Sequence, residues 1–318
     1  MDGADDGSEK RKGKAVLGMK LINPEIRVET SNLCNAKCIV CPREKMTRKK
    51  CIMGDKHFRE LVGQAKELGA TGISPFGYGE PLLDEHLWVK LIYCGDFHTN
   101  ITTNASLLDP DTSRILLASG LKQIRFSAHG MGANYERVHK RLRWMEFIAN
   151  VSEFIRINND VFGHSCTTEV SVIPMHGESV QQIVDFWKPM VDFLEVWRPH
   201  NWTDGKDFRP TARKKKTCGR PFRGPVQIQS DGKMIVCCFD YDGKLTVGDT
   251  HKNSIEEILK GDRFNEIREA HTTGKLDGLI CQTCDQLNIE EHSPLLYSNR
   301  DPEMKAGKTS STKFNLEG

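Results

Sequence analysis

The sequence predicts an α/β fold: a partial (β/α)6 barrel of the TIM-like kind, followed by a small β-hairpin-plus-helix domain. Six short β-rich runs alternate with helical patterns between residues 21 and 200, and the alternation stops after that point. Strands that alternate with helices are typical of a parallel sheet with helical crossovers. In a barrel of this type we expect the chemistry at the carboxyl ends of the strands.

Local patterns define the individual elements of the predicted barrel. Apolar residues recur at helical spacing in the first helix, at Phe58, Leu61, Val62, Ala65 and Leu68. Asp109-Pro110 is typical of a helix start, with an N-cap followed by proline. The predicted strands are Ile26–Thr30, Gly72–Phe76, Thr99–Thr103, Gln123–Ala128, Thr168–Ile173 and Phe193–Arg198. The predicted helices lie near 56–69, 84–94, 109–119, 133–158 and 178–190.

The second region follows a linker rich in Pro, Gly, Lys and Arg over residues 200–225. Val226–Gln229 and Met234–Cys238 flank Ser230-Asp231-Gly232, which predicts a hairpin, and Ile255–Ala270 predicts a helix. We therefore expect a disordered tail at 1–20, the barrel at 21–200, the small domain at 201–290 and a C-terminal tail at 291–318.

Composition excludes some classes of protein. The chain has 318 residues, of which 38% are hydrophobic and 28% are charged. No run of about 20 apolar residues exists, and the polar N-terminus is not a signal peptide, so we expect a cytoplasmic protein without a membrane partner. The net charge of +2 gives no reason to expect nucleic acid as a partner.

Cysteine is unusually frequent. Eleven cysteines without a secretion signal do not predict a disulfide framework. Cys34, Cys38 and Cys41 follow the first strand in one short loop. Three thiolates around a four-iron cluster leave one iron open for a substrate or cosubstrate. The alternative is a zinc site, which needs a fourth ligand, and His57 is the nearby candidate.

The spacing Cys-x3-Cys-x2-Cys after the first strand resembles the radical S-adenosylmethionine (SAM) superfamily. Further motifs stand in the order typical of that family. Gly77-Tyr78-Gly79-Glu80-Pro81 ends the second strand, Thr102-Thr103-Asn104 the third and Ser127-Ala128-His129-Gly130 the fourth. The resemblance implies a [4Fe–4S] cluster that binds and cleaves SAM.

The resemblance also implies roles for individual residues. Gly79, Glu80 and Pro81 are expected at the amino group of the SAM methionine, and Asn104 beside the cofactor. Ser127 and a basic residue on the following helix are expected to hold the SAM carboxylate and ribose; Arg141 is the first choice, while Arg137 and Arg143 compete. Two positions depart from the family pattern. Val40 replaces an aromatic residue that contacts adenine, and Tyr78 replaces the first glycine of the usual pair.

A second set of cysteines lies in the small domain. Cys218 and Cys237 precede a Cys-x2-Cys pair at Cys281 and Cys284. By spacing alone these four thiolates fit either a zinc site or a second iron–sulfur cluster. The surrounding residues, from Cys218-Gly219-Arg220-Pro221-Phe222 to Val247-Gly248-Asp249, resemble the C-terminal SPASM domain of radical SAM enzymes, in its short "twitch" form. That resemblance implies an auxiliary [4Fe–4S] cluster held by all four cysteines.

Together these features resemble the butirosin-pathway aminocyclitol dehydrogenases. We expect a 5′-deoxyadenosyl radical to oxidise a C–H of a small sugar- or cyclitol-like substrate, as in alcohol to ketone, with the auxiliary cluster accepting the electron. Asp240 is a candidate base, although a turn aspartate explains it as well. A reductant such as flavodoxin or ferredoxin is expected as a partner.

Several alternatives stay open at this point. In an epimerase, a cysteine such as Cys238 would return a hydrogen atom to the substrate. The substrate could also be a peptide, as for a maturase, or a nucleotide. The non-enzymatic alternative is a zinc-binding interaction module.

Overall fold

A single sheet of parallel strands forms the centre of the molecule. The computed structural model describes residues 20–288 and 295–298. The six predicted strands are present, pair in chain order and run parallel: β1 (Glu25–Val28), β3 (Gly72–Ser74), β4 (His98–Thr103), β5 (Gln123–Ser127), β7 (Thr167–Val172) and β8 (Phe193–Val196). The partial-barrel prediction is therefore confirmed. The tail predicted at 1–20 lies almost wholly outside the described residues.

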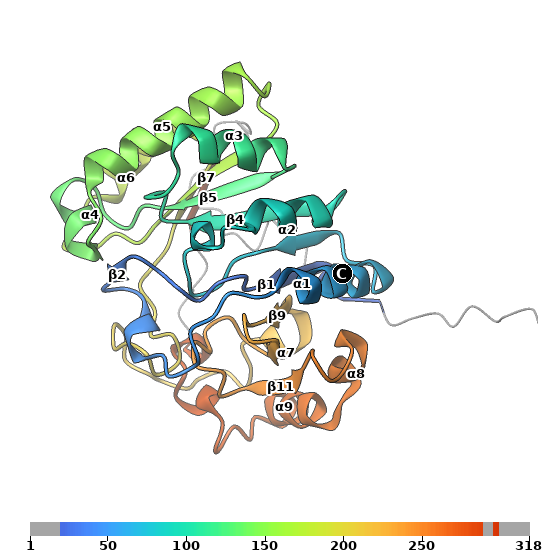
Figure 1. Cartoon of the computed structure of the whole chain (residues 1–318). Coiled ribbons are helices and arrows are strands. Elements are labelled where there is room, and N and C mark those ends of the chain that lie inside the picture. Colours follow the sequence, from blue (N-terminus) through green and yellow to red (C-terminus); the bar gives the residue numbers. More distant parts are fainter. Residues whose placement is uncertain (1–19, 289–294, 299–318) are drawn as a thin grey trace, which may run out of the picture.

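Helices form a layer on one face of this sheet (Figure 1). They are α1 (Asp55–Glu67), α2 (Leu87–Cys94), α3 (Pro110–Ala118), α5 (Trp144–Asp160) and α6 (Val180–Trp187). The Asp109 carboxylate accepts a hydrogen bond of 2.7 Å from the Thr112 N–H, so the predicted N-cap is present. Alternate strand residues such as Ile124 and Phe126 pack against this layer with Leu116 and Phe147, and the intervening side chains face the other side of the sheet.

The helix predicted at 133–158 is wrong, because the chain breaks it in the middle. Residues 133–138 form the short helix α4 (Ala133–Val138), and α5 begins only at Trp144. Between them β6 (His139–Lys140) pairs antiparallel with β2 (Lys37–Cys38) in the cysteine loop. This long-range strand pairing overrides the local helical pattern.

The C-terminal region extends the same sheet. Its elements are α7 (Arg220–Arg223), β9 (Val226–Ile228), β10 (Lys233–Ile235), β11 (Thr246–Asp249), α8 (Ile255–Lys260) and α9 (Asp262–Thr273). The predicted hairpin is present as β9 and β10, and β11 adds a third strand that the sequence did not predict. The helix predicted at 255–270 is two helices, because Gly261 adopts an extended conformation between them.

The two regions share one sheet and one hydrophobic core at their boundary. β9 pairs in parallel with β1, so the C-terminal strands continue the barrel sheet. One hydrophobic core joins them, since Ile26 and Phe58 of the barrel pack in the same cluster as Val226, Ile258 and Phe264. The two regions therefore pack as neighbouring parts of one body (Figure 1).

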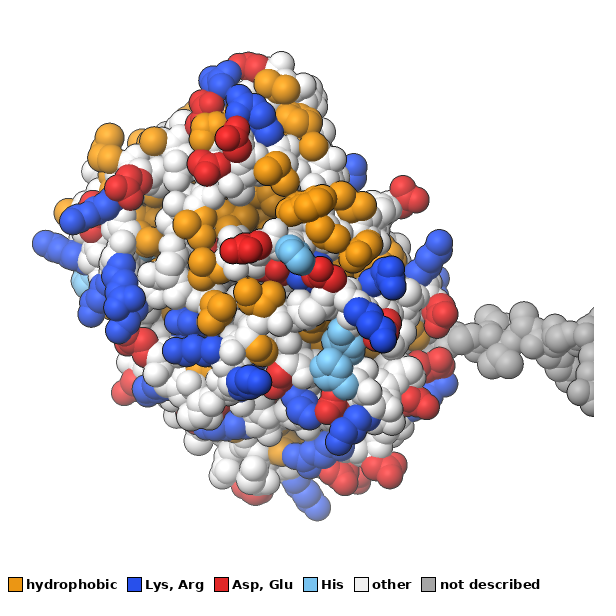
Figure 2. Space-filling view, in the orientation of Figure 1, with side chains coloured by type: hydrophobic (Ala, Val, Ile, Leu, Met, Phe, Trp, Pro, Cys, Tyr) orange, Lys and Arg blue, Asp and Glu red, His pale blue; other side chains and the backbone are white. Residues whose placement is uncertain are grey.

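Short elements complete the described chain. Four 3-10 helices are η1 (Pro42–Lys45), η2 (Pro81–Leu83), η3 (Ile280–Thr283) and η4 (Asp285–Leu287). Within the segment predicted as a tail, β12 (Leu295–Ser298) pairs antiparallel with β8. Hydrophobic side chains gather over α2 in Figure 2, where Trp88 and Ile92 are exposed. None of the helices that the structure describes is long and apolar enough to cross a membrane.

Candidate active site and auxiliary metal centre

The first cysteine loop lies at the carboxyl end of β1 and is held by backbone hydrogen bonds. The Ile39 N–H donates to the Val138 carbonyl at 2.9 Å, and the Cys41 N–H donates to the Cys38 carbonyl at 3.1 Å. Burial raises the pKa of Cys38 well above its ordinary value, and the nearby Cys41 and Cys34 raise it further. Burial raises the pKa of Cys41 to about 11. Three half-buried thiols close to one another suit a group that binds them as thiolates.

His139 contacts this loop directly, and sequence reasoning missed it. Its Nε2 accepts a hydrogen bond of 3.0 Å from the His129 N–H, so Nε2 carries no proton. The neutral ring must then carry its proton on Nδ1, which lies 3.1 Å from the Cys38 Sγ. Burial lowers the pKa of His139 well below its ordinary value, which keeps the ring neutral. His139 is therefore an N–H donor to the sulfur of Cys38.

The glycine-rich loop after β3 packs against the entry to the cysteine loop. A Cβ on Gly79 would lie 2.1 Å from the Ser31 carbonyl oxygen, so only glycine fits there. The Glu80 N–H donates to the Leu33 carbonyl at 2.6 Å. The family resemblance placed Gly79 at the amino group of the SAM methionine; the structure shows Gly79 in close approach to the protein's own backbone. Pro81 is buried and begins η2.

Glu80 is almost completely buried and joins two strand ends. Its carboxylate accepts hydrogen bonds from the Thr103 hydroxyl (2.6 Å), the Asn104 N–H (2.7 Å) and the Leu82 N–H (3.1 Å). Burial raises the pKa of Glu80 to about 7, although these donors oppose the shift. The Asn104 amide in turn donates to the Asn35 side chain in the cysteine loop at 2.9 Å. Glu80 and Asn104 thus fix the loop against β4.

The predicted residues for the SAM carboxylate lie in different surroundings. Ser127 ends β5, and its hydroxyl has no hydrogen-bond partner among the described residues. Arg137, Arg141 and Arg143 are all exposed. Arg143 pairs with Glu136 at 3.1 Å, whereas Arg141 makes no hydrogen bond or ion pair with another residue that the structure describes. The structure therefore brings Ser127 to the carboxyl edge of the sheet and leaves the three arginines at the surface.

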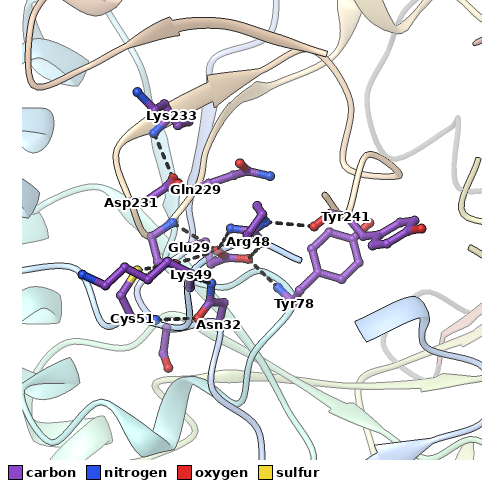
Figure 3. A network of polar contacts seen from close by, with 12 residues as sticks. Glu29, Asn32, Arg48, Lys49, Cys51, Tyr78, Gln229, Asp231, Lys233 and Tyr241 are labelled. Carbon is purple, nitrogen blue, oxygen red and sulfur yellow. Dashed lines mark hydrogen bonds and ion pairs between the residues drawn. The ribbon is translucent and has the colours of Figure 1, made fainter. Parts of the chain in front are cut away.

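A buried ion pair connects the cysteine loop to the C-terminal region (Figure 3). The Arg48 guanidinium donates to both oxygens of Glu29 at 2.9 and 3.1 Å, and both side chains are about 5% exposed. Glu29 also accepts from the Tyr78 N–H at 2.9 Å and from the Ser230 N–H and hydroxyl at 3.1 and 2.9 Å. Arg48 donates in addition to the Tyr241 carbonyl. Glu29 thus ties β1, the glycine-rich loop and the auxiliary region together.

Aromatic side chains fill the space between the two cysteine sets. Tyr78 is enclosed, and its hydroxyl donates to the Cys238 carbonyl. Its ring meets the edge of Trp202, whose indole N–H donates to the Val40 carbonyl at 2.7 Å. The position where the family pattern has glycine therefore carries a side chain that bridges the two sites.

The second cysteine set lines one cavity. Cys218, Cys237, Cys281 and Cys284 all border it, together with Arg220, His271 and Leu245. Burial raises the pKa of both Cys281 and Cys284 to about 12. Residues far apart in the sequence thus bring four thiols to one enclosed space, as the prediction required. Four thiols around a cavity fit an iron–sulfur cluster whose iron ligands all come from the protein.

Cys238 and Asp240 lie beside this cavity and do not line it. The Cys238 sulfur accepts a hydrogen bond of 3.0 Å from Arg220 Nη1. The buried Asp240 carboxylate accepts from the Lys244 and Leu245 N–H groups at 2.9 and 2.6 Å. Asp240 therefore holds the turn that follows it, and burial raises its pKa above the ordinary value.

His57 does not complete a zinc site at the first loop. Its Nε2 lies 2.8 Å from the Thr250 hydroxyl, and its ring stacks on His251. Within the described residues, no three His, Cys, Asp or Glu side chains are arranged to hold a single metal ion.

Three thiols at the carboxyl edge of a partial barrel, with a four-thiol cavity beside it, define an iron–sulfur enzyme with an initiating site and an auxiliary site. The Radical SAM superfamily model matches residues 28–187, half of the chain, and the SPASM iron–sulfur cluster-binding domain matches residues 218–285. The chain belongs to the radical SAM superfamily. It binds a [4Fe–4S] cluster and SAM, and it carries an auxiliary iron–sulfur cluster domain.

Solved structures share this fold. BtrN in complex with AdoMet and 2-DOIA is 18% identical; the match covers 91% of this chain and all of BtrN, with a TM-score of 0.58. SuiB from Streptococcus suis, bound to the precursor peptide SuiA, is 17% identical over 83% of this chain and 70% of SuiB, with a TM-score of 0.64. AnSMEcpe with bound AdoMet is 14% identical over 84% of this chain and 92% of anSMEcpe, with a TM-score of 0.57. No curated protein matches the sequence.

Proposed function

We propose that this protein is a radical SAM dehydrogenase that oxidises a C–H next to a heteroatom, as in alcohol to ketone, on a small sugar- or cyclitol-like substrate. The observation that carries the proposal is the cavity lined by four cysteines beside the three-cysteine loop. Four protein thiolates leave no open iron for substrate at the auxiliary site, so electron acceptance is the role that remains for it. The reducing electron comes from an external carrier such as flavodoxin or ferredoxin.

The bound cofactors supply the radical that removes a hydrogen atom from the substrate. The chain's own residues position them. Cys34, Cys38 and Cys41 hold the catalytic cluster, and Cys218, Cys237, Cys281 and Cys284 hold the auxiliary cluster. Gly79, Glu80, Pro81, Asn104 and Ser127 shape the SAM site, and Asp240 is the candidate base. Arg141 remains a proposed SAM contact, which requires its exposed side chain to turn inward.

Polar side chains on the face of the sheet opposite the helices favour a polar substrate. Arg125 lies there and contacts Glu169 at 2.8 Å and Glu195 at 3.3 Å. Arg27 on β1 binds Glu25. Two β4 side-chain oxygens, Asn100 Oδ1 and Thr102 Oγ1, are buried without a hydrogen-bond partner among the described residues. Buried polar atoms of this kind favour a ligand with hydroxyl or amino groups.

Two alternatives are less well supported by the geometry. An epimerase needs Cys238 as a thiol that returns a hydrogen atom, whereas the Cys238 sulfur accepts a hydrogen bond from the Arg220 guanidinium. The peptide alternative takes its support from SuiB, whose structure contains a precursor peptide. The match covers 70% of SuiB, so part of that protein has no counterpart in the matched region.

Turnover in deuterated water tests the proposal. The reconstituted enzyme is incubated with SAM, a reductant and a panel of cyclitols and amino sugars, with a peptide panel as the matched control. We expect a product lighter by about two mass units and 5′-deoxyadenosine that carries the abstracted hydrogen. A product of inverted stereochemistry with one solvent deuterium contradicts oxidation. Turnover of peptides alone contradicts the small substrate.

A further inference from the structure

Arg220 stands out because it is placed against the auxiliary cavity. It begins α7, two residues after Cys218, and borders the cavity together with all four cysteines. Its Nη1 donates to the Cys238 sulfur at 3.0 Å. Its guanidinium lies over the Phe239 ring, 4.4 Å from the ring centroid. The side chain is therefore fixed by a hydrogen bond on one side and an aromatic face on the other.

No carboxylate in the described part of the chain pairs with this charge. Among residues 20–288, Arg220 forms no ion pair with Asp or Glu; it donates to the Cys238 sulfur and borders the cavity lined by Cys218, Cys237, Cys281 and Cys284. A guanidinium that is partly withdrawn from water and faces a cavity is stabilised by an anionic partner there. Thiolates bound to iron supply that partner, because a cluster with four thiolate ligands is an anion.

The catalytic loop has a different electrostatic environment. The side chains that contact sulfurs there, His139 at Cys38 and Asn104 at Cys34, are neutral, and the buried carboxyl group of Glu80 lies nearby. Arg43 and Lys206 lie near the loop and are half-buried, as Arg220 is, and Arg43 donates to the Asn32 carbonyl at 3.0 Å. At the auxiliary cavity a guanidinium therefore donates directly to a sulfur, whereas the side chains that contact sulfurs in the catalytic loop are neutral.

We propose that Arg220 raises the reduction potential of the auxiliary cluster and so makes it the electron acceptor of the two clusters. Accepting one electron adds one negative charge to the cluster, and a fixed cation beside it stabilises that state. In the balanced step the substrate radical loses one electron to the auxiliary cluster and one proton to a base. The role of this electron transfer in turnover rests on the proposed dehydrogenase function. The effect of Arg220 on the reduction potential of the auxiliary cluster does not depend on that function.

The test uses protein in which Cys34, Cys38 and Cys41 are alanine, so that only the auxiliary cluster is present. Its midpoint potential is measured by reductive titration with electron paramagnetic resonance, without SAM or substrate. At the potential where the parent cluster is half reduced, we expect Arg220→Met to lower the ratio of reduced to oxidised cluster at least tenfold. For one electron, a tenfold change corresponds to a shift of about 59 mV in the midpoint potential. Arg220→Gln keeps N–H donors without the charge, and we expect the same loss.

Two variants complete the comparison. Arg220→Lys keeps a positive charge, so its ratio of reduced to oxidised cluster should stay within about threefold of the parent ratio. This variant tests the proposal even where the neutral variants lose iron. Arg223→Met removes an exposed charge from the same short helix and should change nothing. An unchanged midpoint in iron-loaded Arg220→Met or Arg220→Gln overturns the proposal. A tenfold loss in Arg220→Lys, or an equal loss in Arg223→Met, overturns it as well. Failure of all substrates to react would count against the dehydrogenase function and leave this result intact.

Discussion

The two cysteine sites use the same ligand atoms in opposite ways. The catalytic loop takes three thiols from one short stretch, and a neutral histidine and a buried carboxyl group lie close to them. The auxiliary cavity takes four thiols from distant stretches and places a guanidinium beside them. A site with three thiols leaves an iron open for chemistry, whereas a site with four and a neighbouring cation is suited to receiving charge. The two sites thus differ in the number of thiols and in the side chains that contact their sulfurs, which is the difference on which the proposed division between initiation and electron acceptance rests.

The largest expected effect comes from removing one cysteine set at a time. Replacing Cys34, Cys38 and Cys41 with alanine should abolish formation of 5′-deoxyadenosine, because SAM then has no open iron. Iron analysis should fall from about eight to about four atoms per chain, since the auxiliary cluster remains. The matched control, Cys281→Ala with Cys284→Ala, should keep cleavage of SAM and lose oxidised product. Continued cleavage in the triple variant contradicts the assignment.

The next effect concerns the ion pair that joins the two regions. Glu29→Gln leaves the Arg48 guanidinium buried without its partner. Breaking a buried pair in this way costs about 3–5 kcal/mol of unfolding free energy. Urea unfolding followed by tryptophan fluorescence measures the loss. Glu266→Gln is the control, because the Arg263–Glu266 pair is exposed and its loss should cost less than about 0.5 kcal/mol. Equal losses in the two variants would mean that Glu29 does not join the regions.

The smallest effect is a pH dependence at the catalytic site. Burial raises the pKa of Glu80 to about 7 from its ordinary value of 4.5, so the folded protein binds this proton more tightly than the unfolded chain. The contribution of Glu80 to the free energy of unfolding is fully present below the pKa of the unfolded chain. It is lost as pH rises toward the pKa of the folded protein, by about 3 kcal/mol in total. Glu80→Gln should lack this loss. Urea midpoints at pH values of about 5.5 and 8 compare the two proteins in the same iron-loaded state, without SAM. Parallel changes in both proteins would show that Glu80 is not the group responsible.

Local patterns were enough to predict much of the barrel. β1 and β4 alternate in burial, whereas β7 and β8 are buried on both faces. The first helix buries Phe58, Leu61, Val62 and Ala65 as its spacing predicted. The cysteine spacing also indicated which thiols belong together. The four auxiliary cysteines line one cavity, and Cys238 does not border it. These features depend on short-range periodicity and on ligand chemistry, which a single sequence displays directly.

Contacts between distant residues could not be predicted in this way. The pairing of β2 with β6 places His139 at the Cys38 sulfur, whereas the pattern of that segment indicated a helix and drew attention to Arg141. Glu29 reaches Ser230, about two hundred positions further along the chain. Nothing in the local sequence of either residue indicates its partner. Arg220 lay within a motif noted from the sequence, but its relation to the cavity needed the fold.

The parallel pairing of β9 with β1 has a consequence for cutting the chain. The auxiliary region covers the outer side of β1, the first strand of the barrel. Ending the chain before β9 would leave β1 as an open edge with unpaired N–H and C=O groups and would uncover the apolar surface around Ile26 and Phe58. Exposed edges of this kind recruit strands from other molecules. The barrel of this protein is therefore a poor candidate for isolation as a fragment, because the auxiliary region also protects it from aggregation.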